Sequence, residues 1–145
     1  MKMKIIIGAD HAGFKLKEKI KEYLEELKHS PEDLGTFSKE SVDYPLVAEK
    51  VAEKVAKTKS IGILVCGSGI GMCITANKIK GIRAALCYDE YTAKVARKHN
   101  NANILCLGSR TESARDYKRI IKTFLTTDDS KEERHKRRVK EMDAL

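Results

Sequence analysis

The chain has 145 residues, of which 41% are hydrophobic and 34% charged, and its formal net charge is +8. This length suits one folded domain, and no segment approaches the roughly 18 apolar residues of a membrane-spanning helix. Aromatic residues make up 6% of the chain and tryptophan is missing, so no stacking platform for single-stranded nucleic acid is expected. The start of the chain lacks a signal-peptide pattern, which predicts a cytoplasmic protein.

The four cysteines and four histidines do not form a metal-binding pattern. Three of the cysteines adjoin apolar, strand-like runs and one lies in a helix pattern, a distribution typical of reduced thiols inside the cell. No C-x-x-C occurs, and the histidines are scattered. We therefore expect neither a metal nor a cofactor.

The first part of the chain alternates strand and helix patterns. Residues 4–8 form a short apolar run that predicts a strand. Apolar residues at helical spacing over 16–27 predict an amphipathic helix, and residues 30–35 predict an edge strand at most. Residues 43–45 open a second helix, because the proline at position 45 suits a first helical turn; valines at 47, 51 and 55 form the inward stripe.

Residues 61–71 are the central stretch of the sequence. Residues 61–66 are apolar, rich in β-branched side chains and stopped by glycine, which is typical of a strand buried on both faces of a parallel sheet. Residues 72–78 predict a helix, so Cys66 lies where a strand ends and a loop begins, the place where open α/β sheets bind ligands. Three glycines let the backbone turn tightly and approach a ligand closely, namely Gly67, Gly69 and Gly71.

Two interpretations of Cys66 remain open on this local evidence. Free cysteine is often a small buried hydrophobe. A thiol beside a helix N-terminus, however, can ionise more readily than a free one and act in catalysis.

The second part of the chain continues the alternation. Residues 82–87 and 104–107 predict strands, and Asp89 can cap a helix that runs to about residue 98. Apolar residues between 117 and 124 predict the last core helix, and residues 126–145 form a charged C-terminal arm.

Alternating strands and helices joined by short loops imply a parallel sheet covered on both faces within a single domain, residues 1–145. The loops at 9–13, 66–71, 88–89 and 108–110 all follow strands and should gather at one sheet edge. The G-x-G-x-G spacing after the third strand fits neither the dinucleotide fingerprint nor a Walker A loop.

Seven sequence blocks occur in the chain in this order: GADHAGF (8–14), DLGT (33–36), SVDYP (41–45), CGSGIGM (66–72), ANK (76–78), GIRAA (81–85) and HNNAN (99–103). As a set they resemble the type B ribose-5-phosphate isomerases, a family that includes galactose-6-phosphate and allose-6-phosphate isomerases. The resemblance implies a three-layer αβα sandwich, Rossmann-like or flavodoxin-like, on a five-stranded parallel sheet. It also implies a homodimer or homotetramer with sites shared between subunits and no metal.

The resemblance further implies aldose–ketose isomerisation of a sugar phosphate through an enediolate. Cys66 would be the base, Ser68 would bond the sugar, and His99 would open the furanose ring. The amides of Gly67 to Gly71 would hold the enediolate oxygen. The remaining matched positions are Asp10, His11 and Tyr44 for the sugar, Asn100 as a site neighbour, and Arg110, Arg134 and Arg138 for the phosphate.

Simpler roles exist for several of these residues. Asp10 could cap the first helix, Asn100 could be a turn residue, and Tyr44 could be packing. The tail arginines could be solvated surface. The chain also carries Glu132-Glu133 where the family commonly has Gly-Gly, and two carboxylates there would repel phosphate unless they point away.

Three functions remain open from the sequence. The favoured one is interconversion of ribose 5-phosphate and ribulose 5-phosphate in the pentose phosphate pathway. The second is isomerisation of a hexose 6-phosphate. The third is a non-enzymatic module that binds a phosphorylated ligand or nucleic acid through its basic arm, although nucleic acid is the less expected partner.

Overall fold

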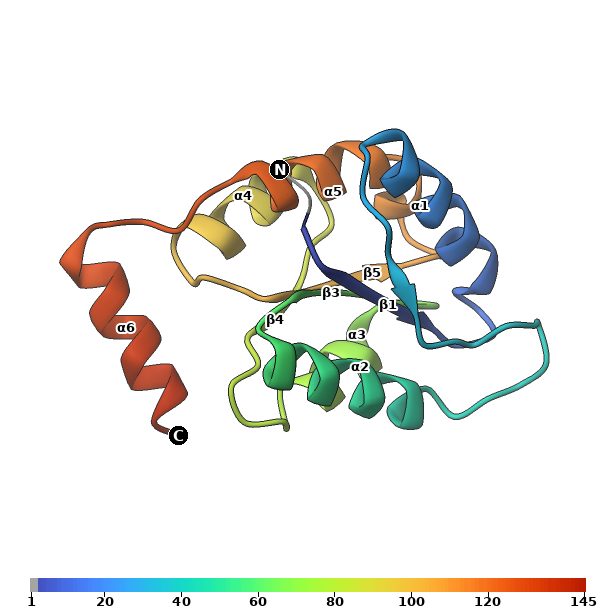
Figure 1. The fold of residues 1–145 in the computed structure, drawn as a ribbon, viewed down its shortest axis with the longest axis horizontal. Helices are drawn as coiled ribbons and strands as arrows, with labels where there is room; N and C mark the ends of the chain where they lie inside the picture. The colour runs from blue at the N-terminus through green and yellow to red at the C-terminus, as the bar shows by residue number, and fades with distance from the viewer. Residues whose placement is uncertain (1–2) are drawn as a thin grey trace.

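The computed structural model describes residues 3–145 and shows a five-stranded, all-parallel sheet between two layers of helices (Figure 1). The strand order is β2-β1-β3-β5-β4. The strands are β1 (Ile5–Ala9), β2 (Glu32–Asp33), β3 (Ile61–Cys66), β4 (Ala84–Leu86) and β5 (Ile104–Gly108). The predicted three-layer αβα sandwich is therefore confirmed.

Side chains alternate between the two faces of the sheet and meet different helices on each. On one face, β1, β3 and β5 pack against α1 (Phe14–Glu26), α4 (Glu90–Lys98) and α5 (Tyr117–Thr126). On the other face, the same strands pack against α2 (Tyr44–Thr58) and α3 (Ile70–Ala76). Cys66 points toward the α2 and α3 side.

Two of the element boundaries that differ from the sequence prediction have a visible cause in the backbone. Helix α3 begins at Ile70 rather than at residue 72, because Gly69 adopts a left-handed φ of 81° that completes the turn early. Strand β4 begins at Ala84 rather than at residue 82. The Ile82 amide donates to the Ile79 carbonyl and the Arg83 amide to the side chain of Asn103, so neither of these two amides donates to β5.

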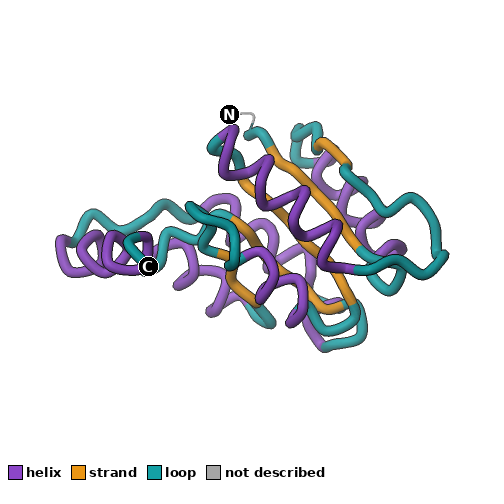
Figure 2. Tube along the Cα trace, turned by 90° about the horizontal axis from the view of Figure 1, so that it is seen from below, coloured by secondary structure: helices purple, strands orange, loops and turns teal. Residues whose placement is uncertain are grey.

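The C-terminal arm forms a helix, α6 (Glu133–Asp143), that stands away from the sandwich in both views (Figures 1 and 2). A short 3₁₀ turn, η1 (Glu112–Ala114), precedes α5. Among residues 3–145 no helix combines the length and apolarity needed to cross a membrane.

The core beside edge strand β2 contains a fully buried lysine. The Lys17 ammonium donates to Asp33 Oδ2, which also accepts from Lys21 Nζ at 2.9 Å. The rings of Phe14 and Phe37 lie 5.4 and 4.9 Å from the same ammonium. A buried charge is tolerated only when it is paired, so this cluster holds the sheet edge through Asp33.

The pKa of Asp33 reflects two opposing effects. Burial raises it, but hydrogen bonds from Lys17, Lys21 and the Gly35 amide outweigh burial and leave the pKa below its usual value. Since the folded-state pKa is the lower one, the carboxylate stabilises the fold at neutral pH. This contribution is lost as the pH falls below about 4.

We predict that Asp33→Ala destabilises the fold by about 3 kcal/mol, because it leaves the Lys17 ammonium buried without its main partner. Urea unfolding at pH 7 measures the loss. Lys54→Ala is the matched control, since it removes a 3.7 Å ion pair with Glu32 on the same strand. That pair is exposed and should contribute less than about 1 kcal/mol. Equal losses in the two variants would contradict the assigned role of Lys17.

Candidate active site

The loops that follow β1, β3 and β5 meet at the carboxyl edge of the sheet, as predicted. The Asp10 amide donates to the Val65 carbonyl at 3.2 Å, and the Ser109 amide to the Cys66 carbonyl at 2.8 Å. The Arg110 amide donates to the carbonyl of Gly67 at 2.9 Å. These bonds fix the three loops to one another around the end of β3.

Cys66 is the last residue of β3 and lies opposite Gly108 in the strand register. Its side chain is nearly buried, and Sγ accepts a hydrogen bond from the Gly69 amide at 3.1 Å. The thiol therefore lies directly under the glycine loop.

The other three cysteines lie elsewhere in the fold. Burial raises the pKa of the Cys87 thiol to about 12. Hydrogen bonding to the fully buried Cys106 lowers the pKa of Cys73 to about 7, against the effect of burial. The Cys73 sulfur contacts the Ala84 carbonyl at 3.5 Å, away from the loops at the sheet edge. Among the cysteines, Cys66 alone ends a strand at the carboxyl edge.

Close packing explains two of the glycines. A Cβ on Gly69 would lie 2.5 Å from a Leu86 methyl carbon. A Cβ on Gly71 would lie 2.8 Å from the Tyr44 hydroxyl and closer still to its ring. Because α3 begins early, Gly71 is already within the helix, with the ring of Tyr44 against its backbone.

The remaining loop residues lie beside this packing. A Cβ on Gly67 would touch the end of the Arg110 side chain at 3.3 Å. Ser68 accepts a hydrogen bond from the Ile70 amide at 3.2 Å. The predicted loop residues are thus together, with the guanidinium of Arg110 beside them.

Asp10 and His11 follow β1 at the same edge. Asp10 is buried, and its Oδ1 accepts from the Gly13 amide at 3.0 Å, a turn at the start of α1. His11 Nδ1 accepts from the Val42 amide at 3.2 Å. An Nδ1 that accepts a bond leaves Nε2 to carry the ring proton, so His11 can present a donor to a ligand.

His99 and Asn100 lie at the opposite, amino edge of the sheet. They belong to the turn after α4, in which the Asn103 carbonyl accepts from the amide of Gly62 at 2.8 Å. Gly62 is at the start of β3 and Cys66 at its end, about 13 Å further along the strand. One chain therefore does not bring its own His99 to its own Cys66.

The tail arginines share the amino edge with His99. His135 on α6 stacks on His99, with ring centroids 4.3 Å apart and an interplanar angle of 7°. Arg134 donates to Glu132 Oε2 at 2.8 Å, so this carboxylate pairs with an arginine to which the family resemblance gives a phosphate-binding role. The Glu133 side chain is almost fully exposed.

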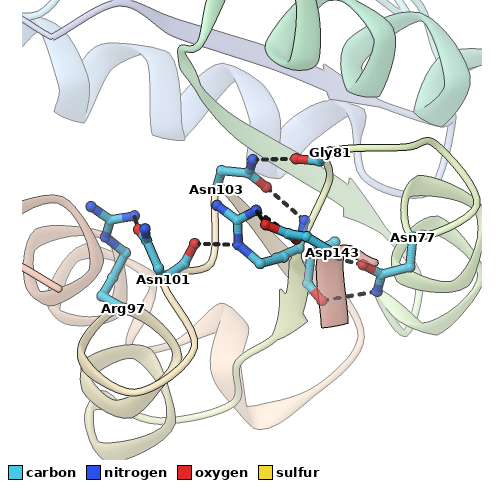
Figure 3. A network of polar contacts seen from close by, with 8 residues as sticks. Asn77, Gly81, Arg97, Asn101, Asn103 and Asp143 are labelled. Carbon is cyan, nitrogen blue, oxygen red and sulfur yellow. Dashed lines mark hydrogen bonds and ion pairs between the residues drawn. The ribbon is translucent and has the colours of Figure 1, made fainter. Parts of the chain in front are cut away.

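A polar network that the sequence analysis missed fastens the far end of α6 (Figure 3). Arg83 donates through Nη1 to both Asp143 oxygens at 3.0 and 3.1 Å, and through Nε to the Asn101 carbonyl at 2.9 Å. The Asn103 side chain joins the Arg83 amide to the Gly81 carbonyl. Arg83 was visible only as part of the GIRAA block, because its partner is 60 positions away.

The parallel sheet belongs to the class of α/β folds that bind a small ligand at the carboxyl edge of the strands. In this chain that edge carries the Cys66 thiol and the glycine loop. The chain belongs to the ribose/galactose isomerase family, whose model matches residues 5–142. It is an enzyme, a sugar-phosphate isomerase.

Relatives and solved structures agree over nearly the whole chain. The chain is 42% identical to ribose-5-phosphate isomerase B of Mycolicibacterium paratuberculosis, covering 94% of this chain and 87% of that protein. It is 51% identical to the type B ribose 5-phosphate isomerase structure from Trypanosoma brucei, with a TM-score of 0.94 and 99% of each chain covered. It is 41% identical to ribose-5-phosphate isomerase B of Mycoplasma genitalium with bound ribulose-5-phosphate. The TM-score to the Mycoplasma genitalium structure is 0.92, and the match covers 97% of this chain and 94% of that chain.

The contact between Tyr44 and Gly71 predicts that Gly71→Ala lowers stability when the Tyr44 ring is present and raises it when the ring is removed. Gly71→Ala should destabilise the wild-type protein by about 2 kcal/mol, because the new methyl group overlaps the Tyr44 ring. In a Tyr44→Ala background the overlap is gone, and glycine to alanine within a helix should stabilise by up to about 1 kcal/mol. Urea unfolding of the four proteins measures both effects. The same cost of Gly71→Ala in both backgrounds would disprove the contact.

Proposed function

We propose that the chain interconverts ribose 5-phosphate and ribulose 5-phosphate through an enediolate, with Cys66 as the base, as a step of the pentose phosphate pathway. The observation that carries this proposal is the Cys66 thiol, placed under the glycine loop at the edge where parallel sheets bind ligands. The relative from Mycoplasma genitalium, with bound ribulose-5-phosphate, supports the choice of sugar.

The reaction moves one proton between two carbons. In the open-chain aldose, the Cys66 thiolate takes the proton from C2. The electron pair of that bond forms the C1–C2 double bond, and the carbonyl pair moves onto O1. The thiol then returns the proton to C1, and the O2 hydroxyl proton passes to O1, which leaves the ketone at C2.

The neighbours of Cys66 have the groups that this step needs. Amides of the loop from Gly67 to Gly71 stabilise negative charge on the enediolate oxygen, where preorganised donors have the greatest effect. The Ser68 hydroxyl and the Asp10 carboxylate bond the sugar hydroxyls. The Nε2 proton of His11 points a donor at the ligand, and Tyr44 covers the loop.

The opposite positions of Cys66 and His99 favour a site built by two chains. We infer a two-fold dimer in which Cys66 of one chain works with His99 of the other, giving two equivalent sites. His99 opens the furanose ring before Cys66 acts, and Asn100 lies beside it. A dimer of such dimers satisfies the same requirement.

The phosphate is bound from both chains. Arg110 approaches from the carboxyl edge, and Arg134 and Arg138 approach from the partner's amino edge, with forked donors that suit the group. The Glu132–Arg134 ion pair weakens the contribution of Arg134, so Arg138 carries more of the phosphate affinity.

Hexose 6-phosphate isomerisation is the second candidate, since the family description also names galactose. The enzyme assayed with ribose 5-phosphate, galactose 6-phosphate and allose 6-phosphate decides between them. Preference for ribose 5-phosphate is expected. A higher kcat/KM for a hexose phosphate would replace the first proposal with the second.

We predict that Cys66→Ala lowers kcat by about 10³-fold, because a positioned base contributes about 10²–10⁴ in rate. The far-UV spectrum and the thermal midpoint should stay close to wild type. Cys73→Ala is the control, since it removes the thiol on α3, which lies at the Ala84 carbonyl away from the loops at the sheet edge, and should keep nearly full activity. Normal turnover by folded Cys66→Ala would return Cys66 to the role of a core residue.

We also predict recovery of activity in mixed dimers. Cys66→Ala and His99→Ala are each inactive, and after joint unfolding and refolding about half the dimers should be mixed. One site of a mixed dimer then collects both mutations and the other collects neither, so activity recovers to about a quarter of wild type. Refolding each variant alone is the control. An inactive mixture, despite demonstrated chain exchange, would rule out the shared site.

A further inference from the structure

The contact between His99 and His135 differs from the rest of the arm. Within α6, His135 is the buried residue, at 8% exposure, while its neighbours along the helix are largely exposed. Its ring lies flat on the His99 ring, 4.3 Å away and 7° from parallel. The arm therefore contacts the rest of the protein at His99, the residue to which the family resemblance gives ring opening.

The His99 imidazole has an unusual support for a catalytic histidine. Such a ring is commonly oriented by a hydrogen bond from one of its nitrogens to a carboxylate or carbonyl. Across residues 3–145 no protein group forms a hydrogen bond with either nitrogen of His99, and the flat contact with the His135 ring lies against its face instead. Both nitrogens stay available to a substrate.

That availability matches the chemistry of ring opening. The C1–O4 bond breaks with its electron pair going to O4, which gains a proton, while the O1 hydroxyl loses a proton and becomes the aldehyde oxygen. One imidazole with two free nitrogens donates its N–H proton to O4 and accepts the O1 proton on its other nitrogen. This works only while the ring plane faces both oxygens.

We propose that His135 is a positioning residue for ring opening: its stacked ring holds the His99 imidazole in the plane that reaches O1 and O4. The proposal rests on the ring-opening role of His99 given above. A misaligned His99 imidazole should lower the rate of ring opening and leave the contacts to the substrate phosphate intact.

The charged groups around His135 suit this role. Burial lowers the pKa of His135, and the neighbouring His99, Arg134 and Arg138 lower it further. Glu132 acts in the opposite direction, with Oε2 3.9 Å from His135 Nε2. A neutral His135 lets His99 take up a proton without a like charge stacked against it.

Two other contacts attach the arm to the rest of the protein independently of the stack. The Ser130 amide donates to the Lys98 carbonyl at 2.8 Å where the arm leaves the body. Asp143 pairs with Arg83 at the far end (Figure 3). Loss of the His135 ring should therefore free the His99 ring while the arm stays attached.

The test compares three variants, His135→Phe, His135→Leu and His135→Ala, on two substrates. Ribose 5-phosphate needs ring opening, whereas 4-deoxyribose 5-phosphate lacks O4 and cannot form the ring. We expect His135→Leu and His135→Ala to lower kcat/KM for ribose 5-phosphate by about 10-fold and to leave kcat/KM for the acyclic analogue nearly unchanged. The His135→Phe variant keeps a flat ring and should retain the wild-type activity on both substrates. Equal losses on both substrates, or Leu as active as Phe, would overturn the proposal.

Asp143→Ala serves as the comparison for a loosened arm, and it should change both substrates by the same factor. His99→Ala distinguishes failure of the ring-opening role of His99 from failure of the positioning role of His135. If His99→Ala does not selectively lower activity on ribose 5-phosphate, the ring-opening role fails. If His99→Ala lowers that activity selectively and the His135 variants do not, only the positioning role fails.

A measurement without substrate gives a second test. Carbon relaxation of the His99 ring should show a rigid imidazole in wild type and His135→Phe, and a mobile one in His135→Leu. A ring equally rigid in all three proteins would contradict the stack as its support.

Discussion

The common direction of the five strands is the constraint on which the rest of this structure depends. Each strand ends at one edge, so each following helix must carry the chain back to the other edge before the next strand begins. Cys66 ends a strand and His99 follows a helix, and the Gly62–Asn103 bond fixes the turn after α4 beside the start of β3. No adjustment of loops within one sandwich removes that separation. The proposed division of the site between two chains is a consequence of strand polarity.

The sequence was most informative where the chemistry is local. The apolar run ending at Gly67 predicted β3, and the proline at position 45 predicted the start of α2. The early start of α3 depended on the left-handed turn at Gly69, which spacing alone does not indicate. The short β4 depended on the side chain of Asn103, twenty residues away, which takes the Arg83 amide. One boundary was therefore missed at a local backbone turn, and the other where a distant side chain competed for a backbone amide.

The supporting residues escaped the sequence analysis for the same reason. Lys17 looks like a solvated residue of an amphipathic helix, and only its pairing with Asp33 explains its burial. His135 looks like one more polar residue of a basic arm until its ring is seen on His99. An exposed helix of this length is marginal in isolation. The fold therefore supports α6 through contacts at the start, near the first turn and at Asp143.

The buried ion pair gives the carboxyl edge a stiffness that its backbone does not supply. Strand β2 has two residues in register with β1, which is too little pairing to fix a long loop by itself. Asp33 adds a side-chain anchor on α1 through Lys17, and its other oxygen accepts from the Gly35 amide at 2.9 Å. The backbone of residues 35–36 then bonds Ala9 on both sides.

The loop fixed in this way leads directly to the Val42 amide that orients His11 and to Tyr44, whose ring lies on Gly71. A buried charge pair is a poor source of net stability, but it accepts few alternative geometries. Here the Lys17–Asp33 pair restricts the geometry of the loop after β2. The loop in turn fixes where His11 and Tyr44 lie relative to the Cys66 thiol.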